Sequence, residues 1–221
     1  MSDAGSRALL VGCGQLGSRH LQALAQLPEI SHIDVVDPRP EALLLGRERL
    51  AELSDRVSGA RVRWLSSLDD AGGRGALCIV ATQAQGRCQL VRDVVQRLHY
   101  RAFLLEKLVA QSMDDYDALM EFCVLQGVSA WVNCKTRAYP FHQRAKQRLD
   151  PSEPLIMHVV GGNHGLANNG VHGADLFAFY DDCERIEPAG SRVDPVLHRT
   201  KRGQYDLSGS LHGFKIGRAH V

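Results

Sequence analysis

The sequence predicts an α/β fold in which a doubly wound parallel sheet is followed by a smaller, incomplete α+β domain. Two observations predict the sheet: a glycine-rich turn between an apolar strand and a helix, and the alternation of short apolar runs with amphipathic segments. A third observation, a change of composition after residue 136, divides the chain into an expected domain at 1–136 and another at 137–221.

The glycine-rich turn gives the strongest functional signal. Residues 8–20 read as a buried strand, then G-x-G-x-x-G, then a helix, which is the context in which this motif binds a dinucleotide. Gly12 permits the tight turn, Gly14 lets the backbone approach a pyrophosphate, and Gly17 lets the helix pack on the strand. Because phosphates bind N–H groups at a helix start, Gln15 and Leu16 are expected cofactor contacts as well.

An acidic residue supports this interpretation. A second expected strand, at residues 31–36, ends in Asp37, about 20 residues after the glycine turn, where a carboxylate binds a ribose hydroxyl. Arg39 follows closely and could hold a 2′-phosphate, but Asp37 would repel one. The sequence therefore predicts a Rossmann domain that takes NAD, with NADP the less expected cofactor. The alternative is an ordinary glycine-rich loop.

Further strands are expected at 76–81, 103–105 and 129–133, with helices between them, the last opening at Ser112. Ligands of such sheets bind beyond the carboxyl ends of the strands. Polar residues that follow strand ends are therefore expected to face one crevice: Asp37, Thr82, Glu106, Lys107 and Asn133. After residue 136 the patterns predict a helix over 139–150, a strand over 155–160, a helix over 170–181, and short strands from residue 184.

Composition excludes several classes of protein. The chain has 221 residues, 44% of them apolar, and a net charge of +1, so no nucleic-acid partner is expected. No apolar run is long enough to span a bilayer, and the N-terminus lacks a signal-peptide core, so we expect no membrane association and a cytoplasmic location. None of the six cysteines forms C-x-x-C or a zinc spacing, so no metal site is expected.

Four motifs, in the same order over nearly the whole chain, resemble those of the glucose–fructose oxidoreductase/inositol dehydrogenase family. They are the glycine turn ending in Gly-Ser-Arg-His at 17–20, Ala-Thr-Gln-Ala at 81–84, Glu-Lys-Leu at 106–108, and Asn-Asn-Gly-Val-His-Gly-Ala-Asp at 168–175. The last two are similar to Glu-Lys-Pro and Asp-x-Gly-x-His-x-x-Asp. The chain departs from the family pattern at Gln83, Arg87, Leu108 and Asn168.

The resemblance implies an NAD(P)-dependent dehydrogenase that moves a hydride between nicotinamide and a hydroxyl or keto carbon of a sugar, polyol or sugar derivative. It places Lys107 and His172 beside the reacting hydroxyl in one cleft, with Asn168 assisting and Gln83 near the nicotinamide. Such side chains can accept a proton or stabilise alkoxide charge. Asn168 can bond a hydroxyl but cannot act as a base.

Each candidate has a plainer interpretation. Lys107 could be a solvated lysine and His172 a helix-start histidine, while Asp175 could pair locally. Arg137 could hold substrate or form an ion pair across the domain junction. His164, in a glycine-rich loop, is a substrate-contact candidate or a surface residue.

The C-terminal part raises a second alternative, a non-catalytic nucleotide-binding module. The chain ends 49 residues after His172, and residues 201–214 resemble the middle of the family's second sheet, so we expect a shortened domain. A sheet that lacks strands leaves an open edge. If enough of it forms, we expect the chain to associate with copies of itself through this sheet.

Overall fold

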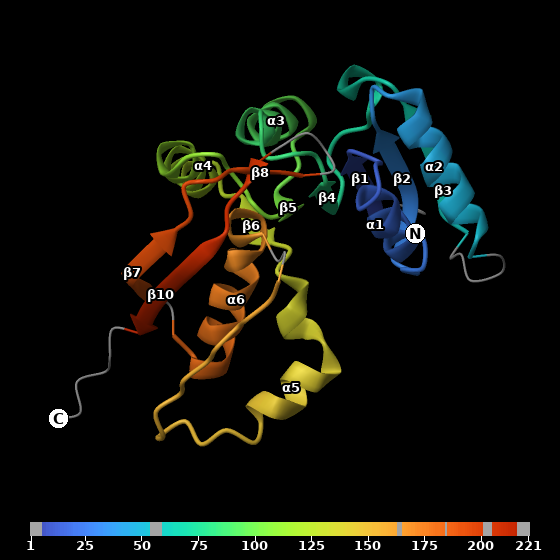
Figure 1. Ribbon diagram of the computed structural model, residues 1–221. Coiled ribbons are helices and arrows are strands. Elements are labelled where there is room, and N and C mark those ends of the chain that lie inside the picture. Colours follow the sequence, from blue (N-terminus) through green and yellow to red (C-terminus); the bar gives the residue numbers. More distant parts are fainter. Residues whose placement is uncertain (1–5, 54–58, 163–164, 184, 201–204, 216–221) are drawn as a thin grey trace. The chain divides into compact units, whose positions relative to one another are not determined.

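We describe the fold from a computed structural model, which covers residues 6–53, 59–162, 165–183, 185–200 and 205–215 (Figure 1). The chain divides into two compact units, Met1–Asn133 and Cys134–Val221.

The first unit is built on six parallel strands in the order β3-β2-β1-β4-β5-β6. This order is that of a dinucleotide-binding sheet, and it confirms the predicted doubly wound architecture. The chain reverses its direction of winding between β1 and β4, so the loop after β1 lies at the point where such sheets bind ligands. The strands are β1 (Ser6–Val11), β2 (Ile30–Val36), β3 (Arg61–Leu65), β4 (Leu77–Val80), β5 (Ala102–Leu105) and β6 (Ser129–Val132).

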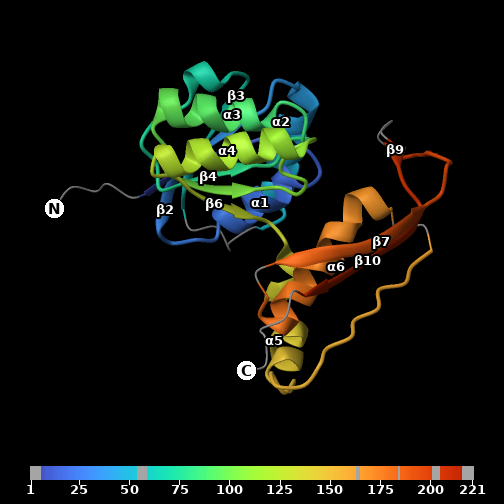
Figure 2. The same cartoon turned by 90° about the vertical axis from the view of Figure 1, so that its left-hand side faces the viewer.

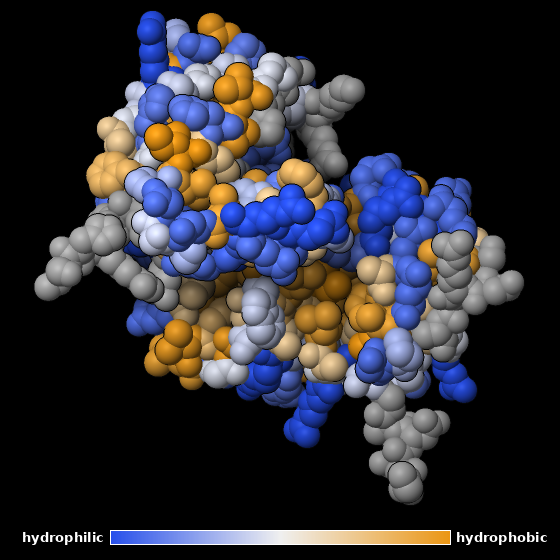
Figure 3. All heavy atoms as spheres, turned by 90° about the horizontal axis from the view of Figure 1, so that it is seen from below, coloured by the Kyte–Doolittle hydropathy of each residue, from blue (hydrophilic) through white to orange (hydrophobic). Residues whose placement is uncertain are grey.

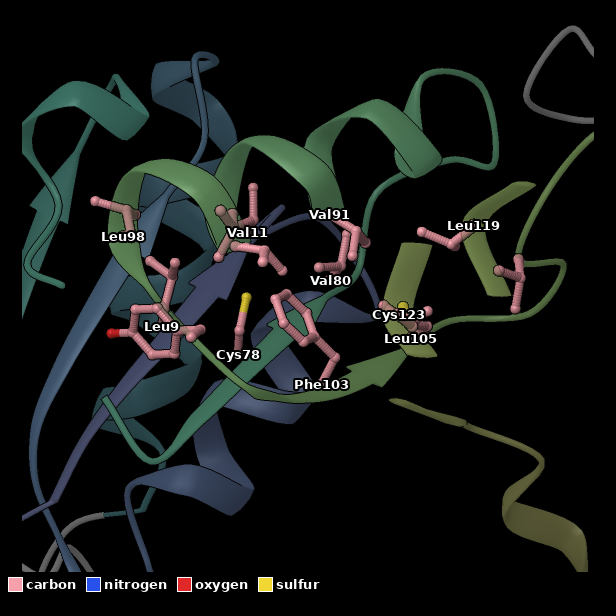
Figure 4. Close-up of a cluster of buried hydrophobic side chains, with 14 of the residues drawn as sticks. Leu9, Val11, Cys78, Val80, Val91, Leu98, Phe103, Leu105, Leu119 and Cys123 are labelled. Atoms are coloured by element: carbon pink, nitrogen blue, oxygen red, sulfur yellow. The ribbon is translucent and has the colours of Figure 1, made fainter. Parts of the chain in front are cut away.

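Helices cover both faces of this sheet, with α3 and α4 along one face and α1 on the other (Figure 2). Alternate residues of each buried strand face opposite sides, so β1 sends Leu9 and Val11 into one core and Ala8 and Leu10 into the other. Figure 4 shows side chains from the strands meeting those of the helical layer in the first of these cores. The helical elements are α1 (Gly17–Leu24), α2 (Pro40–Ala51), the 3-10 turn η2 (Leu68–Asp70), α3 (Arg87–Asp93), the π-helical turn η3 (Val94–Leu98) and α4 (Met113–Leu125).

Strand β3 and helix α2 were not among the predicted elements. Strand β3 has arginines at two of its five positions, so it lacks the apolar run that marks the central strands. Strand β3 is an edge strand of the sheet, where such charged side chains are common. Arg63 donates to the fully buried carboxylate of Asp34 on β2 at 2.7 Å, and Arg7 donates to it at 3.0 Å. Burial raises the pKa of Asp34, but the bonds from Arg63 and from the N–H of Gly72 together hold that pKa below its usual value.

In its described residues, the second unit contains two helices, a 3-10 turn and two small antiparallel sheets, β10-β7 and β8-β9. The predicted helix at 170–181 is present but begins earlier, at Leu166, and the one predicted at 139–150 ends at Lys146. The elements are η4 (Lys135–Ala138), α5 (Pro140–Lys146), α6 (Leu166–Asp181), β7 (Ile186–Val193), β8 (His198–Arg199), β9 (Tyr205–Asp206) and β10 (Gly209–Lys215).

The strand predicted over 155–160 is wrong. This segment is extended but pairs with neither small sheet, and Ile156 and Val160 are 79% and 94% exposed. Its apolar run resembled a buried strand, but a strand needs a hydrogen-bonded neighbour as well as an apolar sequence.

Apolar side chains also reach the surface, where they form several patches in the view of Figure 3. In the second unit they include Val193 and Leu211, on the paired strands β7 and β10, at 43% and 58% exposure. In the part of the chain described here, no helix combines the length and apolar character needed to cross a membrane.

Candidate functional site

At two positions of the glycine turn, the backbone leaves no place for a residue other than glycine. Gly12 has a φ of +89°, and a Cβ on Gly17 would overlap the carbonyl oxygen of Gly12 and lie 2.8 Å from its carbonyl carbon. Gly14 differs, because a Cβ there would meet only the Nη2 atom of Arg39, at 3.5 Å. Gly12 and Gly17 are therefore required by the fold, whereas the absent side chain of Gly14 leaves room beside the turn. This room and the N–H groups at the start of α1 fit a pyrophosphate.

Asp37 lies against this turn. Its carboxylate accepts a hydrogen bond from the N–H of Cys13 at 2.8 Å, and Arg39 donates to it from Nε and Nη2, both at 3.1 Å. Burial raises the pKa of Asp37, but these bonds from Arg39 and Cys13 hold the pKa below its usual value, so the group is a carboxylate at neutral pH. The Arg39 side chain is 60% exposed, so the guanidinium that covers Asp37 lies at the surface.

A cation that the sequence did not reveal also holds the turn. Arg49, on α2, donates to the carbonyl oxygen and the side-chain oxygen of Gln15, and to the hydroxyl of Ser18 at 2.7 Å. It therefore fixes the residue that follows Gly14. No local motif marks Arg49, because its partners lie on a different helix and loop.

Three polar side chains meet at the carboxyl ends of β5 and β6. Glu106 is 5% exposed, and its Oε1 atom lies 2.7 Å from Nε2 of His20 and 2.6 Å from Nδ2 of Asn133. Burial raises the pKa of Glu106, but the hydrogen bonds from His20 and Asn133 hold the pKa below its usual value. Glu106 and Asn133, which were expected to share a crevice, are in direct contact. His20, the last residue of the glycine motif, was not among the predicted site residues.

This cluster predicts a dependence of stability on pH. Because the folded pKa of Glu106 lies below its usual 4.5, the carboxylate stabilises the fold above pH 4.5, and this contribution disappears as the pH falls through the lower folded value. Glu106→Gln is therefore expected to lower the free energy of unfolding by about 1.5 kcal/mol at pH 7 and by less at pH 3. Urea unfolding at both pH values measures this. An equal loss at both would contradict the prediction.

The loops that carry Thr82 and Lys107 are held by a buried cation. Arg87, the first residue of α3, is 1% exposed, and its guanidinium donates to the carbonyl oxygens of Thr82, Glu106 and Leu108. Lys107 lies between the last two of these carbonyls and is half-buried, and its peptide bond to Leu108 is cis. The main chain on both sides of Lys107 is therefore tied to the loop after β4, which also carries the exposed Gln83.

The remaining predicted residues belong to the second unit. Asn168, His172 and Asp175 lie on α6 at i, i+4 and i+7, so they share one face of the helix. Asn168 donates to the carboxylate of Asp206 at 2.6 Å, and Arg137 donates from Nε to Asp175 at 2.9 Å. Arg137 therefore forms its ion pair within this unit and not across the predicted domain junction, and its partner Asp175 lies 38 residues away in the sequence.

The structure thus groups the predicted residues into three sets: the glycine turn with Asp37, the strand-end residues around Glu106, and the α6 face. The first two belong to one unit and the third to the other. His164 lies outside the described residues. Within the described ranges, no three acidic, histidine or cysteine side chains form a group that could bind a metal ion.

Comparison with models of protein families gives no match. A sequence search of curated proteins gives no match either.

Solved structures with the same fold do match, at low sequence identity. The WlbA dehydrogenase of Bordetella pertussis, solved with NADH and UDP-GlcNAcA, has a TM-score of 0.62 and 20% identity, and the match covers 92% of this chain and 69% of that one. The scyllo-inositol dehydrogenase of Lactobacillus casei, solved with NAD(H) and scyllo-inositol, has a TM-score of 0.63 and 12% identity, over 94% and 72%.

A third neighbour is described as a transcriptional regulator, Gal80p of Kluyveromyces lactis, with a TM-score of 0.64 and 16% identity, over 88% of this chain and 55% of that one. The chain thus spans only part of the length of each of these structures. The likeness confirms the predicted resemblance at the level of the fold: the chain has the fold of the NAD-dependent dehydrogenases of the glucose–fructose oxidoreductase/inositol dehydrogenase type.

Proposed function

We propose that this chain binds NAD(H) at the glycine turn and transfers a hydride between the nicotinamide and a hydroxyl or keto carbon of a sugar, polyol or sugar derivative. The observation that carries the proposal is the combination at the carboxyl end of β1. There, the room beside Gly14 and the N–H groups of a helix start lie next to the ionised carboxylate of Asp37. A pyrophosphate and a ribose need these two kinds of partner.

In this proposal Asp37 accepts a hydrogen bond from the adenosine ribose, and the backbone of Gln15 and Leu16 binds the pyrophosphate. The strand-end residues Thr82, Gln83 and Asn133 line the nicotinamide half, where Glu106 orients Asn133 through its 2.6 Å hydrogen bond. The cofactor, when bound, supplies the hydride acceptor or donor.

Side chains of the protein must transfer the proton of the reacting hydroxyl. When a carbinol loses a hydride, its O–H proton must leave as well, and we assign its transfer to Lys107 and His172. A lysine ammonium also stabilises the alkoxide charge that develops. Asn168 hydrogen-bonds a substrate hydroxyl beside His172. The WlbA and inositol dehydrogenase neighbours, which were solved with a nucleotide sugar and a polyol, favour this substrate class.

A second candidate function is a non-catalytic nucleotide-binding module, and the neighbour described as a transcriptional regulator favours it. Titration of the chain with NADH, followed by NAD reduction assays with polyols and nucleotide sugars, distinguishes the two. Binding with turnover supports the dehydrogenase. Binding without turnover on any substrate supports the module, and no binding would contradict both.

The preference for NADH over NADPH tests the role proposed for Asp37. Asp37→Ala removes the ribose acceptor and the negative charge that opposes a 2′-phosphate, and it leaves Arg39 without its carboxylate partner. We expect the Kd for NADH to rise about tenfold and the Kd for NADPH to rise less or to fall. Fluorescence titrations measure both, with Glu48→Ala, an exposed acidic residue of α2, as the control. Equal losses for the two cofactors, or tighter NADPH binding by the unaltered chain, would remove the assignment.

A further inference from the structure

A buried carboxylate lies at the start of α6, although it comes from a segment distant in the sequence. Asp206 is 8% exposed, and its Oδ1 atom accepts hydrogen bonds from the N–H groups of Ala167 at 2.9 Å and Leu207 at 2.8 Å. Its Oδ2 atom accepts from the side-chain amide nitrogen of Asn168 at 2.6 Å. A carboxylate is also favoured at this end of a helix by the helix dipole.

The surrounding backbone is shaped around this carboxylate. A Cβ on Gly165, which has a φ of +76°, would run into the Asp206 side chain. The N–H of Leu166 donates to the carbonyl of Leu207 at 2.8 Å, which ties the start of the helix to the segment around Asp206. Asp206 is therefore held in place by several independent contacts.

We propose that Asp206 is a positioning residue for the substrate site: it fixes the amide of Asn168 and carries the negative charge that the histidine motif lacks at position 168. The inference rests on the proposed function. A side-chain amide can turn either its oxygen or its nitrogen toward a neighbour. Because the Asp206 carboxylate can only accept, it takes the amide nitrogen, so the carbonyl oxygen of Asn168 faces away from Asp206. His172 lies one helical turn further on the same face, so a substrate hydroxyl beside it would donate to that oxygen.

The hydrogen bond between Asn168 and Asp206 predicts that an aspartate at position 168 destabilises the fold. Asn168→Asp places a carboxylate oxygen where the amide nitrogen now lies 2.6 Å from Oδ2 of Asp206. Two carboxylates at this distance cannot both ionise without strong repulsion. We expect the Tm at pH 7.5 to fall by about 5 °C or more, and the loss to shrink below pH 5 as one group takes up a proton.

Asp206→Asn separates two roles of Asp206: it keeps the cap at the start of α6 but changes the orientation of the Asn168 amide. Asparagine still caps a helix, and the backbone N–H groups require its oxygen, so its NH2 group turns toward Asn168 and forces that amide to flip. We expect a Tm within about 2 °C of the unaltered chain, because a hydrogen bond between the two amides remains. The flipped amide offers NH2 to the substrate, so kcat should fall about tenfold or more, with KM changed less than kcat.

The double variant Asn168→Asp/Asp206→Asn, called the exchange, completes a double-mutant cycle with the two single variants. It restores one amide and one carboxylate, with the hydrogen bond reversed. We expect the Tm to recover most of what Asn168→Asp loses. Asn169→Asp is the matched control, since it adds the same charge to the first turns of α6 one residue further along. It should lower the Tm by less than about 2 °C.

The cycle is measured by thermal unfolding at pH 7.5 and pH 4.5 and by steady-state kinetics with the sugar that the chain oxidises. The proposal is overturned if Asn168→Asp is as stable as the unaltered chain at pH 7.5, if the exchange fails to restore the Tm, or if Asp206→Asn keeps full kcat. If the unaltered chain oxidises no sugar, the proposed function fails. The Tm cycle alone then decides whether Asp206 positions Asn168, with additive losses overturning it and recovery in the exchange supporting it.

Discussion

Gly17→Ala is expected to unfold the first unit or to leave it only marginally stable. The new Cβ would overlap the carbonyl oxygen of Gly12, and this contact is with backbone, which cannot move aside as a flexible side chain can. The turn or helix α1 must shift away from the core on its face of the sheet, so we expect a loss of about 3 kcal/mol or more in the free energy of unfolding. Urea unfolding followed by circular dichroism measures it.

Gly14→Ala is the matched control for this result. It adds the same methyl group three residues earlier, where only the exposed guanidinium of Arg39 is in contact range and the backbone φ is one that alanine accepts. Its stability should match that of the unaltered chain within about 0.5 kcal/mol. A Gly17→Ala chain as stable as Gly14→Ala would contradict the close packing of α1 on the turn.

Replacement of Lys107 is expected to have the largest effect on turnover. In the proposed reaction its neutral amine can accept the carbinol proton, and as an ammonium it stabilises charge that develops only in the transition state. Lys107→Ala should therefore lower kcat about 10²-fold to 10³-fold, while the Kd for NADH changes by less than tenfold. Steady-state kinetics and NADH titration of the same protein separate the two effects.

Lys146→Met controls for the loss of a lysine charge. Lys146 donates to the carbonyl of Phe179 and pairs with Asp182, both within the second unit, so its replacement should leave kcat within about twofold of the unaltered chain. Equal losses of kcat and NADH binding in Lys107→Ala would show that Lys107 only holds the cofactor. Unchanged kcat would remove it from the chemistry.

The sequence predicted the first unit well because its signals are local. A strand, a glycine turn and a helix follow one another along the chain, and the central strands are apolar on both faces because helices cover both faces. Strand β3 was missed because an edge strand can carry arginines such as Arg63, whose partner Asp34 lies on the neighbouring strand. That pairing has no counterpart in the periodicity of either segment.

The placement of Asp37, Glu106 and Asn133 was predictable because each follows the end of a strand. Arg49 and Asp206 act through long-range contacts, with Gln15 and Asn168 respectively, and no spacing in the sequence links these pairs. The same reason explains the incorrect strand at 155–160. An apolar run indicates that a segment can pair, but only the fold decides whether a neighbouring strand is present.

The central claim is that the glycine turn binds a nicotinamide dinucleotide, and an NADH titration of the unaltered chain and of Gly14→Ala tests it most directly. Because the added methyl group fills the room left for a pyrophosphate, we predict saturable binding by the unaltered chain and a Kd at least tenfold higher for Gly14→Ala, with both proteins equally stable. Failure of the unaltered chain to bind NADH, or equal affinity of the two proteins, would contradict the account.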